Sequence, residues 1–94
     1  MPAAHRHTDL CTGHGCWPSR PNIQASPDVY INDLGSHRET DDWAVHCCTS
    51  CHGGNLASGS PNVFVNDLEK ARIGDPVDCG SFCMTGSPNV FVND

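Results

Sequence analysis

The 94-residue chain lacks the features of a large enzyme or a membrane protein. It has no long apolar run, so the sequence predicts neither a transmembrane helix nor a signal peptide. Only 37% of its residues are hydrophobic and 6% are aromatic, so we expect a small core that needs a further staple. It has 5 basic residues against 11 acidic ones, a formal charge of −6. This balance argues against nucleic acid or an anionic membrane surface as a partner.

Glycine, proline, cysteine and histidine are plentiful. The nine glycines and seven prolines favour turns and short strands, and no segment shows a helical period. Seven cysteines and six histidines suggest metal binding. Without a signal peptide we expect synthesis in the reducing cytoplasm, where disulfides are disfavoured. The odd number of cysteines also fits poorly with a complete disulfide framework.

One eight-residue segment occurs three times. Ser60–Asp67 reads SPNVFVND, Ser87–Asp94 repeats it unchanged, and Ser26–Asp33 reads SPDVYIND. Each copy opens with a Ser-Pro turn signal, contains strand-forming residues and closes with Asn-Asp. Side chains alternate along a strand, so one face of each copy is aliphatic and the other aromatic. We assign to the core the aliphatic residues Val29, Ile31, Val63, Val65, Val90 and Val92. The aromatic residues form either a docking face or a second core layer: Tyr30, Phe64 and Phe91.

A second repeated element is Arg-x-x-Asp, at residues 6–9, 38–41 and 72–75. It follows the first two copies of the segment, and its third instance stands near the N-terminus. The N-terminal residues therefore complete the last repeat, which predicts a closed ring with pseudo-threefold symmetry. The alternative is three independent Arg–Asp surface pairs. We expect an all-β fold in a single domain spanning residues 1–94, without an extension domain.

Four His and Cys residues occupy two repeat-equivalent positions. His52 and Cys79 each stand eight residues before a repeat serine, and His14 and His46 each stand five residues after a repeat aspartate. A threefold ring brings these connectors together near its axis. Three imidazoles and one thiolate form a closed tetrahedral set typical of structural zinc, with iron as the alternative. The other histidines are expected to be solvated loop residues: His5, His7 and His37.

Two other cysteine patterns compete with this set. Cys48-Thr-Ser-Cys51-His52 matches the c-type haem attachment pattern, although no export signal accompanies it. Cys48 and Cys51 could also bind zinc together with Cys11, Cys16 or Cys83. No local signature selects a nucleophile or a base, and the chain has no glycine-rich phosphate loop. The sequence therefore predicts that the protein is not an enzyme.

The motifs together resemble the PAAR-repeat family over essentially the whole chain. They are the two GSPNVFVN segments, the ARIGDPV segment at residues 71–77, His52-Gly-Gly and Cys79-Gly. The resemblance implies a small β-rich cone with a metal near its vertex, held by His14, His46, His52 and Cys79. The chain departs from the family at Glu69 and Lys70, which replace the first two residues of the family tetrapeptide. It also has six further cysteines, among which Cys47 is the strongest alternative ligand.

The resemblance also implies a function. Such a protein is a non-enzymatic, metal-stabilised tip that caps a trimeric β-helical spike, one copy per trimer, in a phage tail or a type VI secretion system. It would be made in the cytoplasm and assembled at the spike tip, where it helps to pierce a target membrane. Neither a small-molecule substrate nor nucleic acid is expected. Tyr30, Phe64 and Phe91 are the candidate partner-binding residues. The alternative function is a free-standing zinc-binding interaction module.

Overall fold

The computed structural model describes residues 1–93, and these residues form strands, bridges and turns but no helix. Antiparallel hairpins pair the strands two by two: β1 with β2, β3 with β4, and β5 with β6. The strands are β1 (Tyr30–Ile31), β2 (Leu34–Gly35), β3 (Asp42–Cys47), β4 (Cys51–Asn55), β5 (Phe64–Val65) and β6 (Leu68–Glu69). The predicted all-β fold of short strands is confirmed. None of the described residues forms a helix long and apolar enough to span a membrane.

The repeated eight-residue segment forms two turns around its short strand. The Asn-Asp pairs link β1 to β2 and β5 to β6, and both residues of each pair have φ between 53° and 67°. A two-residue turn with two positive φ angles matches the right-handed twist of a hairpin, and Asn and Asp tolerate it well. At the start of each copy, the serine Oγ accepts the backbone N–H groups two and three residues later. The serines are Ser26, Ser60 and Ser87.

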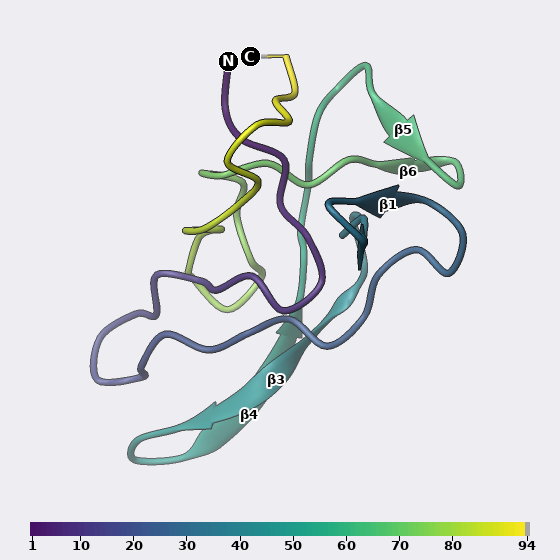
Figure 1. Cartoon of the computed structure of the whole chain (residues 1–94). Coiled ribbons are helices and arrows are strands. Elements are labelled where there is room, and N and C mark those ends of the chain that lie inside the picture. The colour runs from purple at the N-terminus through teal and green to yellow at the C-terminus, as the bar shows by residue number, and fades with distance from the viewer. Residues whose placement is uncertain (94) are drawn as a thin grey trace.

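Three backbone hydrogen bonds close the predicted ring. The His5 N–H donates to Ala71 O, the His37 N–H to His5 O, and the Ala71 N–H to His37 O, at 3.1–3.3 Å. Each of these residues directly precedes the arginine of an Arg-x-x-Asp element. The N-terminal segment pairs with the last repeat, where Val92 N–H donates to Pro2 O at 2.9 Å, so the two ends of the chain run side by side (Figure 1). The pseudo-threefold ring is therefore confirmed.

The Arg-x-x-Asp elements are structural parts of this ring. Each arginine forms an ion pair with its own aspartate at 2.8–2.9 Å, and each carboxylate also accepts that arginine's backbone N–H. Arg6 and Arg38 additionally donate to the hairpin-turn asparagines Asn32 and Asn66. The pairs therefore join turns to the neighbouring hairpins and are not independent surface pairs.

Lys70 lies at the centre of the ring. Its ammonium donates to the carbonyl oxygens of His5 (2.7 Å), Ala71 (2.8 Å) and His37 (3.4 Å), the same three that close the ring. Its repeat equivalents, Ala4 and Ser36, are small and fully buried. The three equivalent side chains converge near one axis, where there is room for only one long side chain. Lys70 can occupy this space because Ala4 and Ser36 are small. Burial lowers the pKa of Lys70 from 10.5 to about 8.

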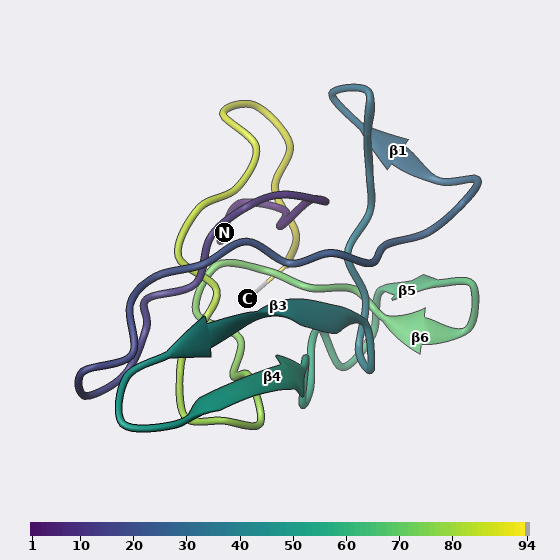
Figure 2. The same ribbon diagram turned by 90° about the horizontal axis from the view of Figure 1, so that it is seen from below.

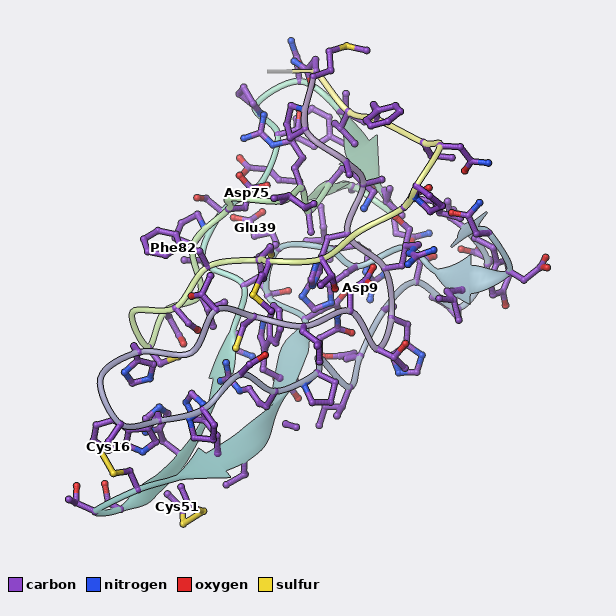
Figure 3. The ribbon with its side chains drawn as sticks, turned by 60° about the vertical axis from the view of Figure 1, so that its left-hand side comes forward. Asp9, Cys16, Glu39, Cys51, Asp75 and Phe82 are labelled. Carbon is purple, nitrogen blue, oxygen red and sulfur yellow. A yellow bond between two sulfur atoms is a disulfide. The ribbon has the colours of Figure 1, made fainter. Side chains whose placement is uncertain are left out.

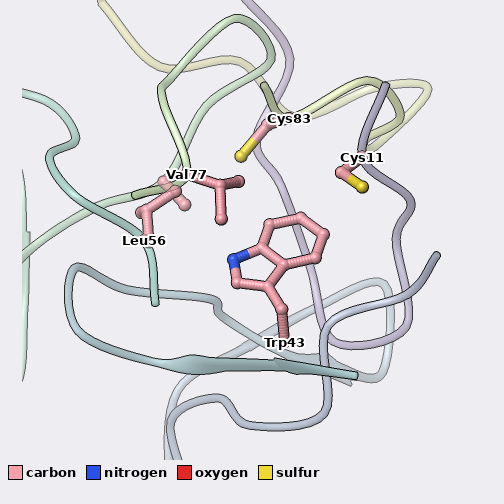
Figure 4. Close-up of a cluster of buried hydrophobic side chains, with 6 residues drawn as sticks. Cys11, Trp43, Leu56, Val77 and Cys83 are labelled. Atoms are coloured by element: carbon pink, nitrogen blue, oxygen red, sulfur yellow. The ribbon is translucent and has the colours of Figure 1, made fainter. Parts of the chain in front are cut away.

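The hydrophobic core lies beside the ring and surrounds Trp43 (Figure 4). His5 and His37 are fully buried, and each ring centroid lies 5.2 Å from that of Trp43. The prediction that these two histidines are solvated is wrong, because both sit on the inner side of the ring. The cluster around Trp43 consists of Cys11, Leu56, Ala71, Val77 and Cys83.

The aliphatic face of the repeats only partly belongs to the core. Val65 and Val92 are buried, but Val29, Val63 and Val90 are 37–39% exposed. All five valines line a depression of about 250 Å³, together with Lys70 and other residues. The core assignment is therefore wrong for the first valine of each copy, because the ring leaves its axis open on this side. The aromatic residues are more than half exposed and form no second core layer in this chain: Tyr30, Phe64 and Phe91.

The molecule is elongated, with principal extents of 36 × 24 × 21 Å. We call the end that carries the short hairpins and the depression the base. The longer β3–β4 hairpin projects from the other end, which we call the tip (Figures 1 and 2). The shape agrees with the predicted small cone.

Candidate metal centre

The β3–β4 hairpin places two histidines face to face. His46 and His52 are register partners, so their side chains leave the same side of the hairpin. The register shifts between Trp43 and His46. Residues three apart on a regular strand point to opposite faces, and a bulge changes this alternation. Trp43 can therefore enter the core while His46 also points inward, and both are buried.

The other two candidates come from tight loops outside the hairpin. His14 lies in a loop closed by hydrogen bonds between the backbones of His14 and Trp17 at 2.8 and 3.0 Å. Gly13 has φ 73°, and a Cβ there would lie 2.6 Å from Trp17 O, so the loop requires glycine. Cys79 lies in a turn closed by a hydrogen bond from Val77 N–H to Ser81 O at 2.8 Å.

The four side chains converge on one point. The Nε2 atoms of His46 and His52 are 2.7 Å apart, those of His14 and His52 3.0 Å, and those of His14 and His46 3.2 Å. With Cys79 Sγ, the four donor atoms lie within 4.8 Å of one another. Tetrahedral zinc with bonds of about 2.0–2.1 Å separates its nitrogens by about 3.3 Å, close to this triangle. Three imidazole nitrogens and one sulfur therefore form a group that could hold a metal ion.

The surroundings of the histidines favour metal binding. Desolvation, and then the neighbouring His46, lowers the pKa values of His14 and His52, so these imidazoles stay uncharged at neutral pH. The His46 Nδ1 lies 2.8 Å from the carbonyl oxygen of Pro18 and donates its proton there. This hydrogen bond leaves Nε2 with a free lone pair directed at the other donors, as is usual for a metal-binding histidine.

Arg20 donates hydrogen bonds near the candidate sulfur donor, Cys79, and this role was not predicted from the sequence. Its side chain is buried, and it donates to Cys79 Sγ at 3.6 Å, to Cys11 Sγ at 3.0 Å and to Ala44 O at 2.8 Å. The guanidinium also lies 5.2 Å from the Trp43 ring centroid. A guanidinium donor suits a negatively charged thiolate. Arg20 belongs to no repeat, so no sequence pattern marked it.

Trp17 covers the imidazoles on one side. Its ring stacks on His14 with a centroid distance of 5.1 Å and an interplanar angle of 18°, and its Nε1–H donates to Ser50 O at 2.9 Å. Trp17 thus holds the loop of His14 against the turn of the β3–β4 hairpin.

Four of the remaining cysteines form disulfides at the tip (Figure 3): Cys16 with Cys48, and Cys47 with Cys51. The expectation that disulfides are disfavoured is therefore wrong. The alternative cysteine sites are wrong as well, because Cys47, Cys48 and Cys51 have no free thiol for zinc or for haem attachment. The hairpin turn brings these residues together, and the sequence did not reveal that turn. Cys11 and Cys83 remain free and lie in the core.

A protein-family model described as PAAR motif matches residues 12–85 and, in a second overlapping match, residues 52–94. No curated protein matches the chain.

Proposed function

Because the chain belongs to the PAAR-motif family, a family of spike-tip proteins of phage tails and secretion systems, we propose that it is the metal-stapled tip of a contractile injection machine. In this role it caps a trimeric β-helical spike, one copy per trimer, and sharpens the spike for piercing a membrane. The function is structural. The observation that supports it most is the closed ring of three similar repeats, whose base is apolar and whose opposite end carries a group of metal donors.

The metal group suits a mechanical role. His14, His46, His52 and Cys79 would hold one ion, zinc by the chemistry of the set, and iron is the alternative. When bound, the ion supplies a cross-link between three segments far apart in the sequence. Four protein donors leave no open position for a reacting water. A small domain with a limited core gains stiffness from such a link, because the binding free energy adds to the folding free energy.

The base suits a trimeric partner. Val29, Val63 and Val90 occupy equivalent positions around the depression, each more than a third exposed. Tyr30, Phe64 and Phe91 form a second set of equivalent residues that are 51–61% exposed, and Phe91 also lines the depression. An apolar surface of this kind usually marks an interface. Its pseudo-threefold arrangement would let one chain offer similar contacts to three identical strand ends.

The first experiment measures metal content. Elemental analysis of purified protein should find one ion per chain, and His52→Ala and Cys79→Ala should each lose it. Full occupancy in both variants would show that these residues are not the ligands.

The second experiment tests docking on the trimeric β-helical spike protein of the same machine. Light scattering after size exclusion should give one chain per trimer, and Phe64→Asp should abolish the complex while the variant stays folded, because Phe64 is 56% exposed. Phe82→Asp is the matched control, since Phe82 is 48% exposed but lies away from the base (Figure 3). If wild-type protein with full metal occupancy does not bind the trimer, a free-standing zinc-binding module is the better description.

A further inference from the structure

The two disulfides at the tip lie next to the metal donors. Cys47 directly follows His46, and Cys51 directly precedes His52. Cys16 stands two residues after His14. Each disulfide therefore joins chain segments that carry different histidines. Cys16–Cys48 connects the loop of His14 to the β3–β4 hairpin across 32 residues of sequence, and Cys47–Cys51 closes the hairpin between His46 and His52.

Apart from the disulfides, few contacts join the loop of His14 to the hairpin: the Trp17 ring stacks on His14 and donates to Ser50 O, and His46 donates to Pro18 O. Residues 47–51, which form the hairpin turn, are all exposed, and so is Cys16. Val45, on the same hairpin, is 63% exposed. The hydrophobic core includes Trp43 but no residue of the turn. A hairpin end with little apolar burial opens at a low free-energy cost unless a covalent link prevents it.

We infer that these four cysteines are an oxidation site that controls how tightly the tip retains its metal ion. This inference depends on the proposed metal centre. When the cysteines are oxidised, the two disulfides hold three imidazoles in position, and the ion leaves only if the whole tip opens. When they are reduced, the turn and the loop of His14 separate more easily, and the ion exchanges. A reducing compartment thus permits loading, and an oxidising one locks the tip.

The chemistry is thiol–disulfide exchange. Each disulfide forms from two thiols, which lose two protons and two electrons. The electrons pass to a disulfide oxidant such as oxidised glutathione, which is released as two thiols. One cysteine thiolate attacks the oxidant and releases its first thiol, which leaves a mixed disulfide. The second cysteine then attacks the cysteine sulfur of the mixed disulfide and releases the second thiol. The exposure of all four cysteines allows such a reagent to reach them. Cys11 and Cys83 are buried free thiols that belong to neither disulfide, so they are not part of this site.

The test compares zinc release in the two redox states. Protein loaded with zinc alone is prepared in oxidised form and after treatment with a phosphine reductant, and release to an excess of a coloured chelator is followed. Thiol labelling after denaturation verifies that the cysteines are oxidised in one sample and reduced in the other. It should find the three cysteines that are free in this structure before reduction and all seven after it. We expect zinc to leave about tenfold faster from the reduced protein, the order of effect that loss of a loop-closing link can produce.

Variants assign the effect to the correct bond. The double variant Cys16→Ser, Cys48→Ser, measured without reductant, should release zinc nearly as fast as reduced wild type, because it loses the link between distant segments. The double variant Cys47→Ser, Cys51→Ser loses only the disulfide that closes the much shorter loop, so it should show a smaller acceleration. Thr49→Ala is the control, since it lies in the same exposed turn and belongs to no disulfide.

Three results would overturn the inference in distinguishable ways. If oxidised protein binds no zinc, the proposed metal centre itself fails. If zinc binds and both redox states release it at the same rate, the metal centre stands and the lock fails. If reduction adds a second zinc ion per chain, the thiols are ligands in their own right and do not serve as a lock.

Discussion

Acid should destabilise this fold through two buried histidines that do not belong to the metal group. His5 Nδ1 donates to Thr85 O at 2.7 Å, and its Nε2 accepts from Asn22 Nδ2 at 3.1 Å. His37 Nδ1 donates to Gln24 O at 2.8 Å, and its Nε2 is buried without a partner among residues 1–93. Protonation of either Nε2 would direct a new N–H at a donor or at apolar surroundings. Both rings are therefore held neutral.

The expected loss of stability follows from the pKa values. Burial lowers the pKa from 6.5 to about 4 in His5 and to about 3 in His37. The unfolded chain thus binds more protons than the folded one below pH 6.5, and the free energy of unfolding falls as the pH falls. At pH 4.5 each histidine lies two pH units below 6.5, and at about 1.4 kcal/mol per unit each removes about 3 kcal/mol. The loss continues towards the two folded-state pKa values.

The variant His37→Phe isolates this effect from acid release of metal. It keeps a ring of similar size, loses the hydrogen bond to Gln24 and no longer titrates. We expect it to be less stable than wild type at pH 7.5, by about 1 kcal/mol for the lost hydrogen bond. At pH 4.5 it should be more stable than wild type by about 2 kcal/mol. Urea unfolding at a series of pH values measures both differences, and the two stability curves should cross.

The control is Phe82→Leu, which changes an exposed side chain that does not titrate. Its stability should change with pH in parallel with wild type. If the His37→Phe curve also runs parallel to wild type down to pH 4.5, then His37 is not held neutral by burial, and the reasoning fails. Protonation of the candidate metal donors should change the stability of the variant and of wild type equally, so it does not affect the difference between them.

Two further predictions concern the ring centre and the metal. Because burial lowers the pKa of Lys70 from 10.5 to about 8, the unfolded chain binds the additional proton between these values, and Lys70 should contribute a rise in stability of about 2–3 kcal/mol from pH 7 to pH 10. Lys70→Met should remove this rise, as measured by urea unfolding; a rise of equal size in the variant would contradict it. Removal of metal by a strong chelator should lower Tm markedly, because an ion that binds only the folded state adds its binding free energy to stability. An unchanged Tm after verified metal loss would mean that the ion is not a structural staple.

The repeats made much of the architecture predictable. The copies of SPNVFVND and the Arg-x-x-Asp elements predicted a closed ring because the third repeat is divided between the two ends of the sequence. The backbone hydrogen bonds among His5, His37 and Ala71 confirm that ring. The same register arguments selected the four side chains that converge at the tip. Both predictions concern residues at repeat-equivalent positions.

The failures concern residues whose environment depends on three-dimensional packing. His5 and His37 look like loop residues in sequence, and only the ring closure buries them. The disulfides require the turn at residues 47–51, which no turn signal marks. Arg20 reaches Cys79 across 59 residues of sequence from a segment without a repeat equivalent. Local patterns carry no information about such contacts.

The candidate metal donors also show how a fold with threefold pseudo-symmetry can bring four donor side chains together. The two repeat-equivalent positions that supply the donors occur three times each, which gives six places around the axis. Four of them hold His14, His46, His52 and Cys79, and the remaining two hold Pro18 and Gly80. Neither of these has a side chain that can bind a metal. Pro18 instead offers its carbonyl oxygen to His46 Nδ1, and Gly80 adopts φ 107° in the turn that carries Cys79. The tip therefore departs from threefold symmetry at two residues that position neighbouring donors, while the base keeps the symmetry that a trimeric partner would require.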